Sequence, residues 1–102
     1  MSSDSRYKVL LSESAIKDLK AIPRKDAERV VKKLRVFGET GRGDIANLRD
    51  DLWRLRVGDY RIFFHWKGEE IRVLRIIPRR IAYRLDLIQS LLKSIKTHPN
   101  PS

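Results

Sequence analysis

The sequence predicts an α+β domain in which a helical hairpin packs on an antiparallel sheet. Two observations lead to this fold class. Residues 24–37 place apolar side chains at helical spacing, and residues 52–77 form three short β-prone runs separated by glycine-containing turns. A chain of 102 residues is long enough for one modest core and too short for two. We therefore expect a single domain over residues 1–102, with a core of about 6–84 and a C-terminal helix and tail of about 85–102.

The N-terminal half predicts one strand followed by two helices. Residues 6–11 are β-prone, and Ser12 is a candidate N-cap for a helix over residues 12–21, which Pro23 ends. A second helix over residues 24–37 carries an apolar stripe and a basic outer surface, and Gly38 is expected to end it. Residues 39–49 are rich in glycine and small polar side chains, so we expect a loop in which Leu48 closes over the core.

The C-terminal half predicts a three-stranded meander. Its strands cover residues 52–57, 60–66 and 70–77, with tight turns at Gly58-Asp59 and Lys67-Gly68. Residues 79–84 leave the sheet. A last amphipathic helix is expected from four apolar positions, Leu85, Ile88, Leu92 and Ile95. The expected order of elements is β-α-α-β-β-β-α.

Positive charge is concentrated in the predicted sheet. The chain has a formal net charge of +10 and a pI near 10.4, which indicates a polyanionic partner: nucleic acid, an anionic membrane surface or an acidic protein. Residues 52–84 hold eight arginines and one lysine against three acidic residues, which is +6 of that charge. The chain has no cysteine, no signal-peptide core and no apolar run near the ~20 residues that a membrane span needs. We expect a soluble cytosolic protein with no membrane partner.

The two faces of the predicted sheet differ in chemistry, because side chains alternate along a strand. The face expected to pack on the helices carries Trp53, Leu55, Val57, Tyr60, Ile62, Phe64 and Trp66. The opposite face is expected to project Arg54, Arg56 and Arg61, with Phe63 and His65 beside them. Arg72 and Arg75 are expected on opposite faces. Clustered guanidinium groups and rings suit single-stranded RNA. An ordinary polar face is the simpler alternative, but neighbouring arginines repel one another.

Most enzyme motifs are absent from the sequence. There is no glycine-rich phosphate loop and no paired-histidine metal site, and Asp50 and Asp51 would make only a weak one, so we predict no metal and no cofactor. RNA can be cut without a metal when its own 2′-hydroxyl attacks the neighbouring phosphate. Arginines stabilise the charge of that transition state well, but they transfer protons poorly because their pKa lies above about 12.

Three segments, LWRLRVGDYRIFF, GEEIRVLRI and PRRIAYR, together resemble the RelE/ParE superfamily of prokaryotic toxins over residues 7–83. The resemblance implies a RelE-like microbial ribonuclease-type fold. Its RelE branch implies a toxin of a toxin–antitoxin system that is a metal-independent, ribosome-dependent mRNA endoribonuclease and inhibits translation. Carried over by position, the catalytic residues are Arg54, Arg61, Arg80 and Tyr83. Arg61 and Arg80 would hold the scissile phosphate, and Tyr83 would stack on a nucleotide.

The same resemblance implies further contacts and leaves alternatives open. RNA or phosphate contacts are expected from Arg56, His65, Arg79 and Arg84. The best-studied RelE pattern has two lysines where this chain has Leu52 and Arg54. A ParE-type toxin that inhibits DNA gyrase without nuclease activity is therefore an alternative, as is an inactive relative that only binds RNA or protein. The toxin hypotheses imply an antitoxin partner, which would cover the arginines and dock on the basic second helix, and the nuclease hypothesis implies the ribosome with its mRNA.

Overall fold

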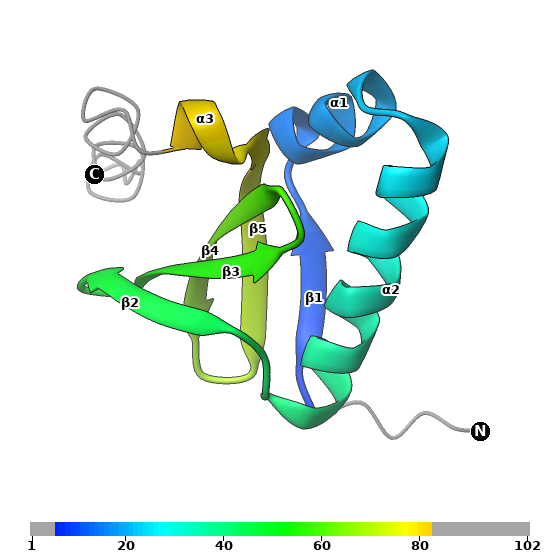
Figure 1. Cartoon of the computed structure of the whole chain (residues 1–102). Helices are drawn as coiled ribbons and strands as arrows, with labels where there is room; N and C mark the ends of the chain where they lie inside the picture. The colour runs from blue at the N-terminus through cyan, green and yellow to red at the C-terminus, as the bar shows by residue number, and fades with distance from the viewer. Residues whose placement is uncertain (1–5, 83–102) are drawn as a thin grey trace.

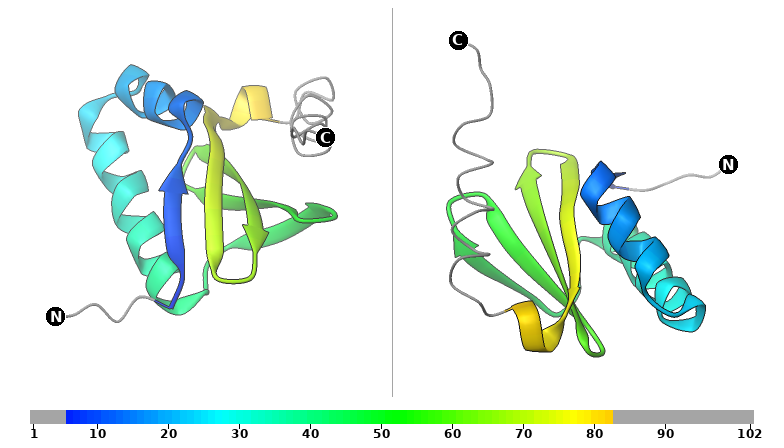
Figure 2. Two further views of the ribbon diagram at one scale, coloured as in Figure 1. Left: turned by 180° about the vertical axis from the view of Figure 1, so that it is seen from behind. Right: turned by 90° about the horizontal axis from the view of Figure 1, so that it is seen from above.

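The protein, described here from a computed structural model over residues 6–82, has two helices packed on one side of a five-stranded sheet (Figures 1 and 2). The elements follow in the order β1 (Lys8–Leu11), α1 (Glu13–Ala21), α2 (Arg24–Thr40), β2 (Ile45–Arg49), β3 (Leu52–Val57), β4 (Tyr60–Lys67), β5 (Glu70–Pro78) and α3 (Arg79–Ala82). The α+β class is confirmed. The amphipathic helix expected from Leu85 to Ile95 lies outside the described residues, as do Tyr83 and Arg84. No helix in the described part is long and apolar enough to cross a membrane.

The sheet has the order β1-β5-β4-β3-β2 and is mostly antiparallel. Strands β2 to β5 form a meander, in which each strand pairs with the next one along the chain. The first strand pairs in parallel with β5, from Lys8 opposite Glu70 to Leu11 opposite Val73. The predicted antiparallel sheet is therefore confirmed for β2 to β5, with a parallel pair added at this edge. No tight turn joins β1 to β5, so hairpin geometry does not set their relative direction.

The second helix is longer than predicted. It ends at Thr40, and Gly41 caps it with a left-handed φ of 73° while donating its N–H to the Phe37 carbonyl at 2.7 Å. Gly38, the predicted end, lies buried inside the helix. A Cβ there would lie 2.8 Å from Val9 Cγ2, so this glycine allows α2 to pack closely on β1. The predicted N-cap of α1 is confirmed, because the Ser12 side chain accepts the Ala15 N–H.

A strand lies where a loop was predicted. Residues 45–49 form β2, the edge strand next to β3, and a bulge interrupts its pairing between Asn47 and Arg49. The sequence of β2 shows no apolar alternation because both of its sides are largely exposed. Leu48 is 37% exposed and does not close over the core, contrary to the prediction.

The turns of the meander use left-handed glycines. Gly58 and Asp59 form the first turn as predicted, with a Gly58 φ of 58°. The second turn is made by Gly68 and Glu69, one residue later than predicted, because β4 extends through Lys67. Gly68 has a φ of 60°. Both glycines adopt a backbone conformation that strains most other residues.

The core lies between the helices and the predicted apolar face of the sheet. Its buried members include Val30, Leu34 and Phe37 from α2, and Ile62 and Phe64 from β4. At one end the Trp66 ring packs edge-on against neighbouring rings, those of Tyr7, Phe37 and Trp53. The prediction of which face packs on the helices is confirmed. The arginines of the sheet therefore belong to the opposite face.

Candidate functional site: the arginine face of the sheet

A bulge in β5 reverses its alternation and assembles the arginine face. Arg75 lies opposite Phe63, whereas the next residue of β4 lies opposite Val73, so Leu74 is the extra residue. Arg72, on the N-terminal side of this bulge, lies opposite His65. Arg72 and Arg75 therefore share one face, contrary to the prediction that they diverge. We define the arginine face as the sheet surface turned away from α1 and α2 that carries Arg54, Arg56, Arg61, Phe63, His65, Arg72 and Arg75.

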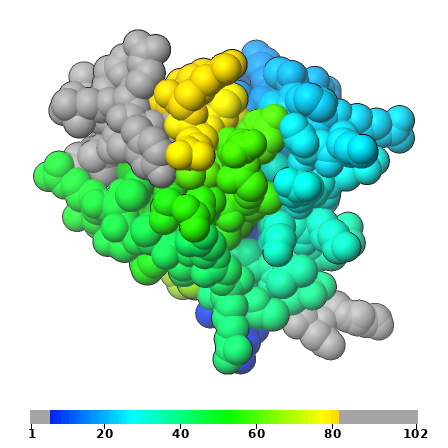
Figure 3. All heavy atoms as spheres, viewed as in Figure 1, coloured from blue at the N-terminus to red at the C-terminus, as the bar shows by residue number. Residues whose placement is uncertain are grey.

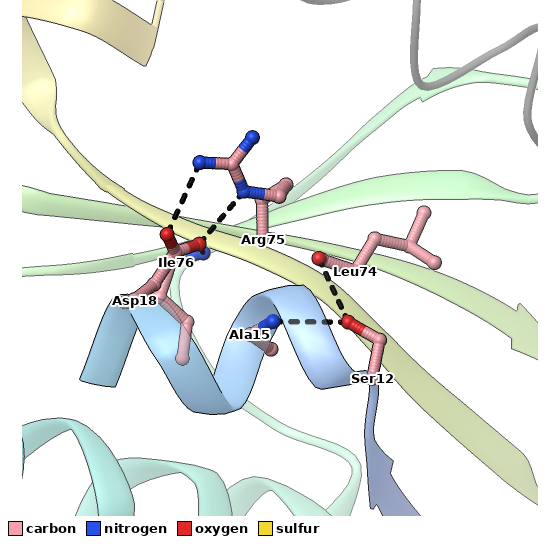
Figure 4. A network of polar contacts seen from close by, with 6 residues as sticks. All are labelled: Ser12, Ala15, Asp18, Leu74, Arg75 and Ile76. Atoms are coloured by element: carbon pink, nitrogen blue, oxygen red, sulfur yellow. Dashed lines mark hydrogen bonds and ion pairs between the residues drawn. The ribbon is translucent and has the colours of Figure 1, made fainter. Parts of the chain in front are cut away.

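The start of α1 stabilises this bulge (Figure 4). The Ser12 hydroxyl donates to the Leu74 carbonyl at 3.0 Å and accepts the Ala15 N–H at 3.0 Å. One helical turn later, the Asp18 carboxylate accepts the Ile76 N–H at 2.9 Å. Two polar side chains of one helix thus satisfy backbone groups of β5 that β1, which ends at Leu11, does not reach.

Asp18 also fixes Arg75. The Arg75 guanidinium donates to both carboxylate oxygens, from Nε at 2.8 Å and from Nη2 at 3.1 Å (Figure 4). The hydrogen bond to Asp18 raises the pKa of Arg75, although its partial burial opposes that effect. This arginine is held by its own protein, so its main contribution is to the fold.

Arg54 and Arg56 lie two residues apart on β3 but differ in their surroundings. Arg56 is exposed, and its Nε lies 2.7 Å from the Asp44 carboxylate. Arg54 is half-buried opposite Phe63, and its Nε is buried with no hydrogen-bond partner among the described residues. A buried N–H without a partner is costly, so the hydrogen-bonding capacity of this guanidinium is not satisfied within the described residues.

Arg61 lies on the arginine face, as predicted, but it does not project from it. It is 3% exposed, and its Nη1 donates to the carbonyls of Gly58 at 3.2 Å and Tyr60 at 3.1 Å. The guanidinium thus braces the turn between β3 and β4. The expectation that it stands beside Arg54 and Arg56 as a surface cation is wrong, because strand alternation gives the face of a residue and not its depth.

His65 contacts Asp51, a residue that the sequence suggested only as part of a weak metal site. The His65 Nε2 lies 3.5 Å from the Asp51 carboxylate, and both side chains are partly exposed. Asp51 belongs to the β2–β3 turn, where the preceding Asp50 has a left-handed φ of 53°. Its carbonyl accepts the Trp66 N–H at 3.0 Å, which ties this turn to the strand that carries His65.

A hollow of about 480 Å³ lies at the other end of the sheet. It is lined by Asp59, Tyr60, Pro78, Arg79 and Arg80. Arg79 and Arg80 are exposed at the start of α3, and the Arg79 N–H donates to the Asp59 carbonyl at 2.7 Å. The Tyr60 hydroxyl donates to the Asp26 carboxylate of α2 at 2.8 Å, and that hydrogen bond raises the pKa of Tyr60. Sequence reasoning placed Arg79 and Arg80 here but missed the contribution of Tyr60 and Asp26, which depends on a contact between distant segments.

The predicted site residues fall into two groups along the sheet. Arg79 and Arg80 border the hollow at one end, and His65 lies near the other end, with Arg54 between them. Arg61 and His65 are four positions apart on β4, which is about 13 Å at the usual rise of a strand. Tyr83 and Arg84 lie outside the described residues, so their positions relative to these groups stay predictions. Arg72 was missed as a site residue because the bulge has no sequence signal of its own.

Exposed basic side chains also gather on α2, outside the arginine face. Helix α2, which lies on the right of Figure 3, carries this second set of exposed basic side chains. A shallow groove of about 390 Å³ on this helix is lined by Arg24, Ala27, Glu28, Val31, Lys32 and Arg35. This groove has an apolar floor and a basic rim. The arginine face and the α2 groove therefore offer two different surfaces to an anionic partner.

Comparison with known proteins gives a consistent result. The model of the family described as "ParE toxin of type II toxin-antitoxin system, parDE" matches residues 9–83. A chain of the archaeal RelE–RelB complex from Pyrococcus horikoshii OT3 is 26% identical with a TM-score of 0.63, over 72% of this chain and 96% of that one. A chain of the RelB–RelE antitoxin–toxin complex from Methanococcus jannaschii is 24% identical with a TM-score of 0.63, over 74% and 96%.

A chain of the chromosomal ParDE system from P. aeruginosa has the same fold, at 19% identity and a TM-score of 0.60, over 72% of this chain and 96% of that one. None of the curated proteins compared with the sequence is significantly similar to it. The family model covers most of the described residues, and it includes both the strands of the arginine face and the start of α3. The chain belongs to the ParE toxin family of type II toxin–antitoxin systems, within the RelE/ParE superfamily.

Proposed function

We propose that this toxin is an mRNA endoribonuclease that acts on the ribosome and so inhibits translation. The observation that carries the proposal is the arginine face. Its register brings Arg54 and Arg72 to one surface, and the buried Nε of Arg54 has no hydrogen-bond partner in the described part of the chain. Guanidinium groups bind phosphate oxygens with charge-assisted hydrogen bonds and stabilise the extra negative charge of a phosphoryl transition state. Similarity to the archaeal RelE–RelB complexes supports the same branch of the superfamily.

The proposed roles follow from where each side chain lies. Arg54 holds phosphate oxygens on the face, while Arg79 and Arg80 bind the RNA backbone where it enters the hollow. Arg61 braces the β3–β4 turn from below and adds positive charge. Tyr83 stacks on a nucleotide of the bound RNA, and Arg56 and Arg84 contribute further phosphate contacts. No metal or cofactor takes part in this mechanism.

An antitoxin partner is the second part of the proposal. The structural relatives include RelE–RelB and RelB–RelE complexes. This chain has two basic surfaces, the arginine face and α2, that suit an acidic or amphipathic segment of an antitoxin. We propose that the antitoxin covers the arginine face and docks on α2, and that both proteins act in the cytoplasm. Mixing with the product of the adjacent reading frame should give a tight complex that no longer arrests translation. Lack of binding would count against this part of the proposal.

Primer extension on mRNA programmed into purified ribosomes tests the nuclease. We expect cuts at fixed codon positions that require the ribosome. Arg54→Ala should slow cleavage by about 10²-fold, which is the scale for losing one transition-state contact. Arg80→Ala should instead weaken the binding of the message. Lys17→Gln and Lys20→Gln change exposed residues of α1 and serve as charge-matched controls. Full activity in both arginine variants would refute the site assignment, and intact message with wild-type toxin would refute the nuclease itself.

Inhibition of DNA gyrase is the second candidate function. The observation that favours it is the family model, whose description names ParE and parDE. The two candidates separate in one pair of assays, because a gyrase inhibitor blocks supercoiling of plasmid DNA and leaves ribosome-bound message intact. An inactive relative would do neither.

A further inference from the structure

We propose that His65 is the proton-transfer residue of the toxin and that Asp51 is its positioning residue. This inference rests on the proposed nuclease function and deepens it. The proposal places the scissile phosphate at one end of the arginine face. At this end His65 on β4 lies between Leu52 on β3 and Arg72 on β5. The proposal assigns Arg80, at the other end of the sheet, to binding the RNA chain away from the cut.

The chemistry requires a group that the arginines do not provide. Cleavage by the 2′-hydroxyl needs a base that takes its proton, and an arginine keeps its own proton at any physiological pH. Histidine is the side chain whose charge ordinarily changes between pH 5 and 8. Among residues 6–82 the chain has a single histidine, and it lies on the arginine face.

The geometry around His65 fits this role. Its side chain is 24% exposed, so it is accessible from the face and still held by its surroundings. The Asp51 carboxylate lies 3.5 Å from Nε2, and its backbone is tied to β4 through the Trp66 N–H. A carboxylate beside a histidine orients the ring and stabilises the imidazolium that forms when it accepts a proton. This arrangement supplies a base and its orienting partner from two adjacent segments.

The same end of the face supplies phosphate ligands. Arg72 lies directly opposite His65, because the β5 bulge turns it to this side. Arg54 is the diagonal neighbour of His65 across the β3–β4 pair, a separation of about 7–8 Å between backbone positions. The charged groups around His65 are Asp51 from the β2–β3 turn, Arg54 on β3, Lys67 on β4, and Arg72 with its ion-paired Glu70 on β5. A phosphate bound between Arg54 and Arg72 would lie within reach of the imidazole.

The step balances with the groups named. Neutral His65 takes the proton of the 2′-hydroxyl while the 2′-oxygen attacks the adjacent phosphorus and the bond from phosphorus to the 5′-oxygen breaks. The products are a 2′,3′-cyclic phosphate and a 5′-hydroxyl end, whose oxygen takes a proton from solvent. The imidazolium, stabilised by Asp51, then returns its proton to solvent. The arginines hold the phosphate oxygens and remain charged throughout.

The test is the pH dependence of single-turnover mRNA cleavage on saturating ribosomes. His65→Asn and His65→Gln should each lose at least about 100-fold in rate and should also lose the rise in rate between pH 5 and 8 that a neutral base produces. Asp51→Asn should lose about 10-fold and shift that rise to another pH, and Asp51→Glu should recover most of the rate. A purely structural role would lower the rate without changing its pH profile.

The outcomes separate this inference from the proposed function. Ribosome binding and far-ultraviolet circular dichroism of the two His65 variants establish that they are folded, and free imidazole should partly restore cleavage in His65→Ala. If the wild-type toxin cuts mRNA and the His65 variants keep its rate and pH profile, the assignment of His65 is overturned while the nuclease stands. If the wild-type toxin does not cut mRNA, both proposals fall together.

Discussion

At the scale of single residues, the environment decides what each arginine of the sheet can do. The carboxylates of Asp44, Glu70 and Asp18 contact Arg56, Arg72 and Arg75, but only the last of these pairs is substantially protected from solvent. Exposed pairs contribute about 0–1 kcal/mol each and exchange readily for a phosphate. Arg56 and Arg72 therefore stay available to a ligand, whereas Arg75 does not.

The hydrogen bond between Tyr60 and Asp26 gives a testable effect on stability. It joins β4 to α2 at the edge of the hollow, at 2.8 Å, with a charged acceptor. Tyr60→Phe removes the donor and keeps the ring, so the free energy of unfolding at pH 7 should fall by about 1 kcal/mol for this partly exposed pair. Urea denaturation monitored by fluorescence measures it. Removing Asp26 from the Tyr60→Phe variant should cost less than removing it from the wild type, because the pair is already broken.

The same pair predicts how stability changes at alkaline pH. The pKa of Tyr60 is raised in the folded state, mainly by the hydrogen bond to Asp26. The folded protein thus binds this proton more tightly than the unfolded chain, whose tyrosine has a pKa of about 10. The stabilisation is complete below pH 10 and is lost as the pH rises through the folded pKa. Tyr60→Phe should flatten the loss of stability above pH 9.5, and an unchanged alkaline slope would show that Tyr60 does not cause it.

At the scale of elements, the sequence predicted those helices and strands that depend on local sequence pattern. The helical hairpin and the three strands of the meander follow from apolar periodicity and glycine turns, which act over a few residues. The edge strand β2 was missed because it buries too little to need apolar alternation. The β5 bulge was missed because Leu74 receives its hydrogen bond from Ser12, 62 residues away in the chain. Contacts of that range are not encoded in a short window of sequence.

The contact of α1 with β5 predicts an unequal pair of variants. Asp18 accepts three hydrogen bonds from Arg75 and Ile76, and its side chain is only 15% exposed. Asp18→Ala leaves a half-buried guanidinium and a strand N–H unpaired, so the free energy of unfolding should fall by about 2 kcal/mol. Glu28→Ala breaks the ion pair with Arg24 on α2, where both side chains are mostly exposed, and should cost no more than about 0.5 kcal/mol.

Chemical denaturation of the two variants checks this prediction. Equal costs for Asp18→Ala and Glu28→Ala would mean that Asp18 is no more than a surface acid. Because Asp18 holds the strand segment that follows the bulge, hydrogen exchange of the β5 amides should also accelerate in Asp18→Ala and remain unchanged in Glu28→Ala. The bulge turns Arg72 toward His65. Asp18→Ala therefore also tests whether the contact of α1 with β5 supports the arginine face.

At the scale of the whole molecule, the sequence predicted the presence of the site better than its organisation. Net charge and strand alternation identified a cationic sheet face and placed Arg54, Arg56 and Arg61 on it, which the register confirms. Burial depth and ion pairing were not predictable, because they depend on what distant segments place beside each residue. The buried state of Arg61 and the contact between His65 and Asp51 are the two consequences that most change the view of the site.

The overall charge of +10 predicts that RNA binding weakens steeply with salt, but it does not say which surface is responsible. The surface that contacts the RNA phosphates can be identified from how the salt dependence of RNA affinity changes in variants. Each phosphate contact with a single strand contributes about 0.7 to the slope of log K against log salt concentration. The double variant Arg54→Gln/Arg72→Gln should therefore lower the slope by about 1.4. The double variant Lys17→Gln/Lys20→Gln removes the same charge from exposed positions of α1 and should leave the slope near that of the wild type.

Fluorescence anisotropy with a labelled single-stranded RNA at several salt concentrations provides the comparison. Both double variants change the net charge from +10 to +8, so a binding mode governed by total charge would reduce affinity equally in both. A difference in slope between them locates the phosphates on the arginine face. Equal slopes would place the RNA elsewhere, with the basic groove of α2 as the next surface to test.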